Sequence, residues 1–360
     1  MMLSDETIFL TGFPGFIAGR LVRRLAREGA RFVLLVQAAF MERAREEAER
    51  IVEETGAGVE AFRIVEGDIT RPGLGLSAQD LETTRGETTM LFHLAAVYDL
   101  GVSRELAMRV NVEGTQNVNR FAELLQESGR LRHYHYVSTC YVAGLRTGVI
   151  LESELRHEAG FRNYYEETKY LAELEVEALK SRLPLTIHRP SVVCGDSQTG
   201  ETAKYDGVYY LINYLRMQPA LLSLANIGNR DVRLNVVPVD FVVEAMAALA
   251  GDERAAGATV QLADPAPLTT HELFDIISKA LTGHGSRLTI PAPLVRTSLV
   301  LPISEGLTGL PRVGVPYFFI KQTYDTTRAQ ALLEPYGLRC PPFPSYVNAL
   351  IDFVARHPKL

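Results

Sequence analysis

The first 200 residues alternate short apolar runs with longer segments in which apolar residues recur at helical spacing. Short runs rich in β-branched and apolar residues, bounded by polar or turn residues, are typical of buried strands. A further run of this kind follows near residue 260. We expect strands over residues 7–10, 31–36, 61–68, 90–96, 131–138, 184–190 and 258–263.

The segments between these runs have the pattern of amphipathic helices. Ile17, Leu21, Val22 and Leu25 form one apolar stripe, and residues 41–54 form a helix rich in Glu and Arg. Strands that alternate with helices require crossover connections, which are right-handed and produce a parallel sheet. The pattern therefore predicts an α/β fold with a doubly wound parallel sheet.

The pattern changes after about residue 195, where turn residues and prolines become frequent. A helix over 240–250 and the strand near 260 resemble the earlier part of the chain. We expect residues 1–195 and 236–264 to form a nucleotide-binding domain, and residues 196–235 and 265–360 to form a smaller substrate-binding lobe.

Composition excludes several classes of function. A net charge of -6 and a pI of about 5.8 provide no field that would gather nucleic acid. Cys140, Cys194 and Cys340 lie far apart, so we expect buried thiols and no metal site. No apolar run is long enough to span a bilayer, and the first residues do not have the pattern of a signal peptide. We expect a cytoplasmic protein.

A glycine-rich segment, TGFPGFIAG, joins the first expected strand to the first expected helix. This is the context in which a dinucleotide-binding loop occurs in the Rossmann fold. Gly12 would allow a tight turn, and Gly15 would let the backbone approach a pyrophosphate at the positive end of the helix. A simple turn between strand and helix remains the alternative.

Tyr165 and Lys169 stand four residues apart in the segment YYEETKY, which places both on one face of a helix. A phenol is a poor acid or base at neutral pH, and a nearby ammonium favours its ionised form. The pair therefore suggests acid-base catalysis, although this spacing also occurs by chance in many helices.

Together these motifs resemble the extended short-chain dehydrogenase/reductase family over nearly the whole chain. That family tolerates Ala18 at the third position of the glycine loop. The resemblance implies that Tyr165 exchanges a proton with the substrate oxygen, and that Lys169 holds the nicotinamide ribose and lowers the pKa of Tyr165. It places Thr139 on the catalytic Ser or Thr that orients the substrate oxygen, in preference to Ser138. It also places Asn111 on a helix behind the site, where an asparagine helps orient a water relay to the lysine.

The resemblance also implies where an NAD(P) cofactor lies. Gln37 occupies the position that an acid would take for NAD, so we favour NADP(H) over NAD(H), with Arg20 or Arg43 as candidate phosphate partners. Asp68 is expected beside the adenine, with a turn role as the alternative. The complete expected set is Thr11, Gly12, Phe13, Pro14, Gly15, Phe16, Ile17, Gln37, Asp68, Ile69, Leu94, Ala95, Ala96, Tyr165, Lys169, Pro190, Ser191 and Val193.

Two branches of the family compete for the substrate. Segments 67–77, 195–201 and 235–246 resemble the fatty-acyl and thioester reductases of the male-sterility type. We therefore expect reduction of a hydrophobic carbonyl or thioester, presented on coenzyme A or a carrier protein. The alternatives are a sugar-nucleotide epimerase or dehydratase, for which Arg216, Arg230 and Arg233 could hold a diphosphate, and a non-catalytic cofactor-sensing protein.

The apolar, proline-broken segment 287–311 bears on the same question. It is compatible with the core of the lobe, an acyl tunnel, a peripheral membrane contact or a homodimer surface.

Overall fold

The computed structural model describes residues 3–217, 224–291, 294 and 314–359. Its centre is a seven-stranded sheet with the order β11-β7-β5-β4-β1-β2-β3, in which every pair of neighbours is parallel. The predicted α/β doubly wound sheet is confirmed, and each of the seven expected strands is present. These strands are β1 (Thr7–Thr11), β2 (Arg31–Val36), β3 (Phe62–Glu66), β4 (Met90–His93), β5 (His133–Val137), β7 (Leu185–Pro190) and β11 (Thr259–Leu262).

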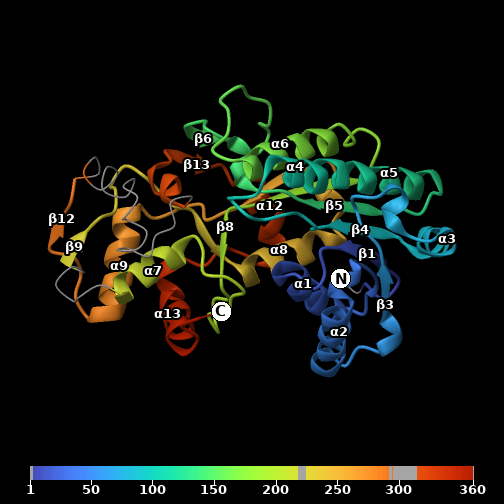
Figure 1. The fold of residues 1–360 in the computed structure, drawn as a ribbon, viewed down its shortest axis with the longest axis horizontal. Helices are drawn as coiled ribbons and strands as arrows, with labels where there is room; N and C mark the ends of the chain where they lie inside the picture. Colours follow the sequence, from blue (N-terminus) through green and yellow to red (C-terminus); the bar gives the residue numbers. More distant parts are fainter. Residues whose placement is uncertain (1–2, 218–223, 292–293, 295–313, 360) are drawn as a thin grey trace.

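Helices cover both faces of this sheet, as Figure 1 shows. One apolar cluster joins the sheet to the helices on one face, and a second cluster joins it to the helices on the other. The first face carries α1 (Phe16–Ala26), α2 (Met41–Thr55), α8 (Val239–Ala250) and α12 (Thr327–Leu333). The second carries α3 (Ala78–Glu87), α5 (Gly114–Glu127) and α6 (Tyr164–Glu177), with α4 (Arg104–Ala107) and a π-helical turn (Met108–Glu113) leading into α5.

The helices form where the apolar stripes predict them. Leu21, Val22 and Leu25 of α1 are fully buried against the sheet. In α2 only Ala44, Ala48 and Ile51 are buried, which leaves its Glu and Arg residues on the solvent side. The first face of the sheet is thus closed by narrow apolar stripes of α1 and α2, and the carboxyl ends of the strands are where such folds bind a ligand.

A smaller lobe lies beside the carboxyl ends of the strands, at the left of Figure 1. Its apolar cluster combines three helices that come from distant parts of the sequence. They are α7 (Val208–Met217), α9 (Thr270–Thr282) and α13 (Val347–Arg356). α9 begins with a capping box in which Thr269 and Glu272 bond each other's backbone amides, so its first turn is well defined.

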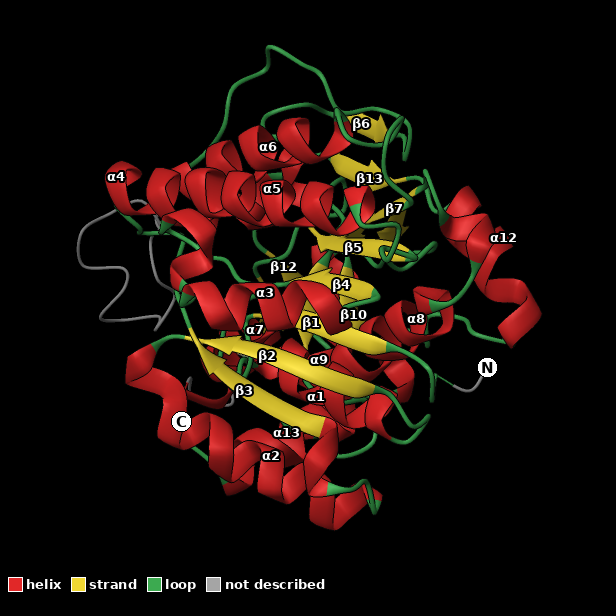
Figure 2. Ribbon diagram, turned by 90° about the vertical axis from the view of Figure 1, so that its right-hand side faces the viewer, coloured by secondary structure: helices red, strands yellow, loops and turns green. Residues whose placement is uncertain are grey.

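Three two-stranded parallel pairs connect segments that are far apart in sequence. They are β8 (Val192–Cys194) with β10 (Val236–Pro238), β9 (Ala225–Asn226) with β12 (Leu288–Thr289), and β6 (Gly148–Ile150) with β13 (Gln322–Tyr324). Figure 2 shows β6 and β13 at the end of the sheet near β7 and α6.

One part of the expected lobe belongs elsewhere. β13 pairs with β6, and Ala329, Leu332 and Leu333 of α12 lie in the same apolar cluster as the nucleotide-binding domain. This occurs because the apolar face of α12 packs on β11 and α8. We therefore propose that the lobe comprises residues 196–235 and 265–360 without the segment 322–338.

Two expectations concern membranes and the segment 287–311. Across the described ranges no helix is both long enough and apolar enough to cross a bilayer. Residues 292–293 and 295–311 of the apolar segment lie outside the described residues.

Candidate active site

The glycine-rich loop is a tight turn between β1 and α1. Gly12 has a φ of +98°, and a Cβ there would lie 2.9 Å from the backbone N of Ala95. A Cβ on Gly15 would lie 2.7 Å from the carbonyl oxygen of Gly12. Both positions therefore require glycine, because the loop backbone lies directly against itself and against the segment after β4.

The first turn of α1 fits a phosphate. Gly15 is its N-cap and provides no side-chain cap, and no acidic residue stands in the first turn. The helix start thus keeps backbone N–H groups and the positive end of its dipole for an anion. Ala18 is buried where the helix packs on the sheet, as expected for the third position of the motif.

The side chain of Thr11 is buried at the end of β1. Its Oγ1 lies 2.7 Å from Nδ1 of His93 and accepts a hydrogen bond from the N–H of Ala95. The hydroxyl therefore fixes the segment that follows β4. Seven other residues of the expected cofactor set follow β1, β3 or β4 at the same edge of the sheet. They are Phe13, Pro14, Phe16, Ile17, Ile69, Leu94 and Ala96.

Gln37 and Asp68 lie together at the ends of β2 and β3. A hydrogen bond from Gln37 and two from Thr70, both of 2.8 Å, help to hold the pKa of Asp68 below its usual range although burial opposes this. Asp68 thus has the turn role considered from sequence. Arg20 forms ion pairs with Asp196 at 3.1 Å and with Glu201 at 2.7 Å, so its charge is already matched. Arg43 is exposed in the first turn of α2.

Thr139, Tyr165 and Lys169 meet at the carboxyl end of β5. Thr139 follows this strand, while α6 carries the other two residues. A side-chain hydrogen bond joins Thr139 to Tyr165. Lys169 Nζ donates to the carbonyl oxygen of Val137 at 2.9 Å and to the hydroxyl of Tyr136 at 3.0 Å. The fold thus gathers the three expected catalytic side chains around the last residues of one strand.

Burial sets the protonation of this group. It raises the pKa of Tyr165, and the hydrogen bond from Thr139 opposes the rise only in part. Burial also lowers the pKa of Lys169 to about 8, while the nearby carboxylate of Glu173 acts in the opposite direction. A lowered pKa for Tyr165 was expected from its lysine neighbour. That expectation is wrong for this arrangement, because the ring is desolvated and the ammonium is bonded to β5.

Asn111 and Ser138 have other partners. The side chain of Asn111 accepts from the N–H of Val97 at 2.8 Å and donates to Thr168 Oγ1 at 3.0 Å. It thereby ties the segment after β4 to α6. Ser138 donates to the carboxylate of Glu173, which supports Thr139 as the residue that faces a substrate.

The segment after β7 forms the next wall of the site. Thr139 Oγ1 lies 3.5 Å from the carbonyl oxygen of Pro190, and Ser191 donates to Asn235 Oδ1 at 2.8 Å. Val193 lies in β8 and pairs with Val237 of β10. These contacts fix the backbone that passes beside Thr139.

Aromatic and aliphatic side chains surround Tyr165 on the side facing the lobe. Tyr165 forms an apolar cluster with Val102 and Ala107, and Leu100 packs against this cluster. The ring of Tyr98 meets that of Tyr165 edge to face, with a centroid separation of 5.3 Å. Lys204 from the lobe lies over the Tyr98 ring, so the lobe reaches the segment that packs on Tyr165.

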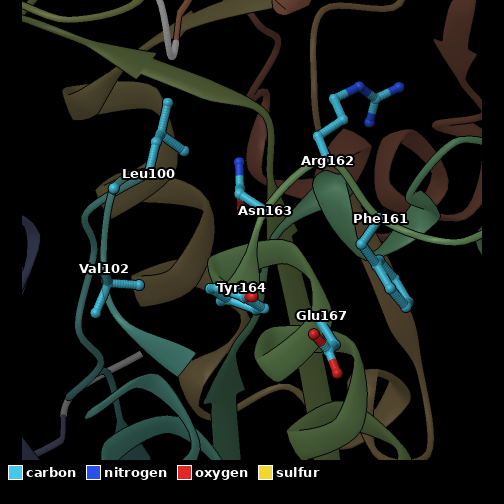
Figure 3. A pocket seen from close by; sticks show the side chains of 8 residues that line it. Leu100, Val102, Phe161, Arg162, Asn163, Tyr164 and Glu167 are labelled. Atoms are coloured by element: carbon cyan, nitrogen blue, oxygen red, sulfur yellow. The ribbon is translucent and has the colours of Figure 1, made fainter. Parts of the chain in front are cut away.

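A pocket of about 480 Å³ opens next to this cluster, between residues 100–102 and the start of α6. Leu100 and Val102 form one wall in Figure 3, and Phe161 and Tyr164 form another. Val102 belongs to the same apolar cluster as Tyr165 and Leu100 packs against that cluster, so the pocket opens next to the surroundings of the expected catalytic residue.

The comparisons with known proteins agree with this geometry. Residues 10–246 match the NAD-binding family described as Male sterility protein. The chain belongs to this family. Its fold is that of the extended short-chain dehydrogenase/reductase type, and its sequence resembles that of a fatty acyl-CoA reductase, as expected above.

Two relatives of this male sterility family member are reductase-like. Fatty acyl-CoA reductase wat from Drosophila melanogaster is 26% identical over 288 residues, which cover 70% of this chain and 55% of that protein. The chain thus spans about half of that relative. The terminal R domain from the myxalamid PKS-NRPS biosynthetic pathway has a TM-score of 0.81 at 25% identity, covering 99% of this chain and 92% of that one.

The fold is also shared with sugar-nucleotide enzymes. MoeE5 in complex with UDP-glucuronic acid and NAD has a TM-score of 0.63 at 20% identity, covering 97% of this chain and 99% of that one. Two of the three arginines considered for a diphosphate have hydrogen-bond partners within the lobe. Arg230 bonds His271 at 3.1 Å, Arg233 bonds the carbonyl oxygen of Pro267, and Arg216 is exposed at the end of α7.

Sequence reasoning missed several polar residues in the core of this male sterility family member. His93, Thr115 and Tyr136 lie behind Lys169 and form a connected group. The sequence did contain a signal for buried polar residues, because β5 has the sequence His-Tyr-His-Tyr-Val, whereas a buried parallel strand usually consists of Val, Ile or Leu. Cys140 and Cys194 are buried as expected, but Cys340 is only half-buried. Within the described part of the chain, no three His, Cys, Asp or Glu side chains are grouped to hold a metal.

Proposed function

We propose that this chain is an NADPH-dependent reductase that converts a hydrophobic thioester, an acyl-CoA or acyl-carrier ester, to an aldehyde. The observation that carries the proposal is the junction at the end of β5, where Thr139 bonds Tyr165 and Lys169 is buried beside them. The fatty acyl-CoA reductase among the relatives supports the acyl-CoA class.

In this mechanism the cofactor supplies a hydride to the carbonyl carbon. Thr139 orients the carbonyl oxygen, and Tyr165 donates a proton to it as the hydride arrives. Tyr165 is protonated at neutral pH, as a proton donor must be, although burial raises its pKa and so makes it a weaker acid than a free phenol. The resulting carbon bears hydrogen, hydroxyl and sulfur. Collapse returns the hydroxyl proton to Tyr165, breaks the carbon–sulfur bond, and releases an aldehyde and a thiol that takes up a proton.

Lys169 would hold the cofactor ribose. An ammonium has three protons, and Lys169 directs two of them at Val137 and Tyr136. The third is available for a ribose hydroxyl. The glycine loop and the uncapped start of α1 would hold the pyrophosphate.

The preference for NADPH rests on the end of β2. Gln37 carries no negative charge that would repel a 2′-phosphate or bind a 2′-hydroxyl in its place. Arg20 is occupied by Asp196 and Glu201, so the exposed Arg43 is the better candidate for a phosphate partner.

The acyl group would occupy the pocket beside Tyr165. Leu100, Val102, Phe161 and Tyr164 offer apolar surface there for a hydrocarbon chain, while Arg162, Asn163 and Glu167 add polar groups to the same lining. The engagement of Arg230 and Arg233 within the lobe weighs against a sugar diphosphate.

The test is a substrate panel with purified protein. NADPH or NADH is combined with acyl-CoAs of several lengths, matching acyl-carrier proteins, fatty aldehydes and UDP- or dTDP-sugars, and absorbance of the reduced cofactor is followed. We expect oxidation of NADPH with an acyl thioester and release of free thiol. The acyl-CoA and acyl-carrier arms distinguish the two donors. Conversion of a sugar nucleotide without reaction of any thioester or aldehyde would overturn the proposal.

A further inference from the structure

The ammonium of Lys169 lies in a buried polar site on β5. Lys169 is only 4% exposed, and its Nζ lies 3.0 Å from the hydroxyl oxygen of Tyr136. The same atom lies 4.5 Å from the centroid of the Tyr136 ring. One side chain therefore offers the ammonium both a hydrogen-bond acceptor and the face of an aromatic ring.

Tyr136 is itself held rigidly. It is 1% exposed, and its hydroxyl also hydrogen-bonds with Thr115 of α5. Thr115 Oγ1 lies 3.0 Å from Nε2 of His93, whose other ring nitrogen lies 2.7 Å from Thr11 Oγ1. A chain of buried polar contacts thus runs from the glycine loop through Tyr136 to Lys169.

Asn111 is not the side chain that contacts the ammonium of Lys169. Its side chain is bonded to Val97 and Thr168, and only its backbone carbonyl reaches the buried chain, as the acceptor for Thr115. Among the described residues, the side-chain hydroxyl that contacts the lysine ammonium is that of Tyr136.

The charged and titratable groups around Lys169 come from α6, β4, β5 and β7. Glu173 of α6 favours the charged lysine, but Glu173 is also paired with Arg189 of β7 at 2.5 Å. His93 of β4 is neutral, because burial lowers its pKa to about 3. Tyr165 of α6 and Tyr136 of β5 both have pKa values raised by burial, so both are uncharged at neutral pH. The hydroxyl of Tyr136 and the carbonyl of Val137 thus add two hydrogen-bond acceptors to the charge of Glu173 in stabilising the ammonium.

We propose that Tyr136 is the positioning residue of Lys169, whose hydroxyl and ring keep the ammonium charged and fixed at the end of β5. This inference rests on the proposed function, in which Lys169 holds the cofactor ribose with its third proton. Without the Tyr136 hydroxyl, the buried ammonium loses one of two oxygen acceptors, and desolvation shifts the lysine toward its neutral form.

The chain contains a matched control. Tyr134 stands two residues earlier on the same face of β5 and is equally buried. Its hydroxyl donates to Asn119 Oδ1 at 2.9 Å instead of contacting Lys169. Tyr134→Phe and Tyr136→Phe therefore each remove one buried hydroxyl from one strand, and only the second removes a lysine contact.

The direct test measures the protonation of Lys169 by NMR with lysine labelled at 13Cε. The chain has only six lysines, and Lys169→Arg assigns the resonance of interest. In the wild type we expect titration near the pKa of about 8. In Tyr136→Phe the lysine pKa should fall by about one unit, as expected for a lost charge-assisted hydrogen bond. It should not change in Tyr134→Phe.

The outcomes separate this proposal from the proposed function. An unchanged lysine pKa in Tyr136→Phe, or an equal fall in Tyr134→Phe, would overturn the positioning role. With the best substrate of the panel, the alkaline limb of the kcat profile should also move to lower pH in Tyr136→Phe alone. If the wild type turns over no substrate, the proposed function fails, and the NMR titration still decides the role of Tyr136.

Discussion

At the scale of single residues, Tyr165 and Lys169 share one helix but meet different partners. Tyr165 bonds Thr139, whereas Lys169 bonds the backbone and Tyr136 of β5. Desolvation keeps the phenol protonated and reduces the stability of the ammonium. At neutral pH the phenol of Tyr165 is therefore protonated, as the proposed proton donor must be.

Replacing Tyr165 with Phe should remove the proton donor and leave the cofactor site intact. We expect kcat to fall by about 10²–10⁴-fold, with little change in the Kd of NADPH measured by its fluorescence. Tyr170→Phe is the control, because Tyr170 lies on the same helix and contacts His157 and Phe161. Retained turnover in Tyr165→Phe would favour a non-catalytic or differently catalysed role.

Replacing Gln37 with Glu adds one negative charge with almost no change in shape. The charge would repel a 2′-phosphate and can bind a 2′-hydroxyl, so the ratio of kcat/KM for NADPH to that for NADH should fall by about tenfold or more. Gln37→Ala is the control for loss of the hydrogen bond to Asp68. An unchanged ratio in Gln37→Glu would show that the cofactor ribose lies elsewhere.

At the scale of elements, the turn from β1 to α1 is the most constrained part of the candidate site. Gly12 lies against the backbone of Leu94 and Ala95, and Gly15 lies against Gly12. The turn can therefore change neither its path nor its side chains without moving β4. That close approach brings the cofactor loop next to the segment that covers Tyr165.

Gly12→Ala should destabilise this turn for two reasons, its positive φ and the contact of 2.9 Å with Ala95 N. We expect a loss of unfolding free energy of about 2–3 kcal/mol and weakened NADPH binding. Gly56→Ala is the control, because Gly56 has a φ of +72° and no atom within 4 Å of an added Cβ. It should lose only about 1 kcal/mol in a denaturant titration. Equal losses of unfolding free energy in Gly12→Ala and Gly56→Ala would show that the contact with Ala95 N does not contribute to the destabilisation.

The strands of the sheet were predictable, but the smaller pairs were not. Continuous apolar runs match strands within three residues at each end, and the run over residues 31–36 matches β2 at both ends. β9 and β12 have two residues each, and β6 pairs with a strand more than 170 residues away. Such pairs have no periodic signal because tertiary contacts alone define them.

At the scale of the whole molecule, four buried histidines lie within the sheet. His133 and His135 of β5 stack at 4.0 Å, and His135 also stacks with His188 of β7 at 5.3 Å. His93 lies in the polar group of the neighbouring strand. Burial lowers the pKa of His133 to about 4, of His188 to about 3 and of His93 to about 3, and it strongly lowers that of His135.

These histidines should make the fold sensitive to acid. Because each folded pKa lies below the unfolded value of about 6.5, the unfolded chain binds more protons as pH falls. Stability is therefore fully present above about pH 7 and declines below about pH 6.5, by roughly 1 kcal/mol per histidine at about pH 5.5. Denaturant titrations between about pH 7.5 and 5 measure this slope. His188→Leu should reduce the slope, while exposed His284→Gln should leave it unchanged.

The sequence by itself determined the class of fold and the order of its chemical parts. Strand and helix periods, the glycine spacing and the pair Tyr165 and Lys169 are local patterns, so they can be read along the chain. Only the tertiary structure decided that Tyr136 contacts Lys169, that Arg20 is occupied by the lobe, and that α12 packs on the sheet. These outcomes depend on segments 33 to more than 150 residues apart, whose approach is set by burial of apolar surface and not by local spacing.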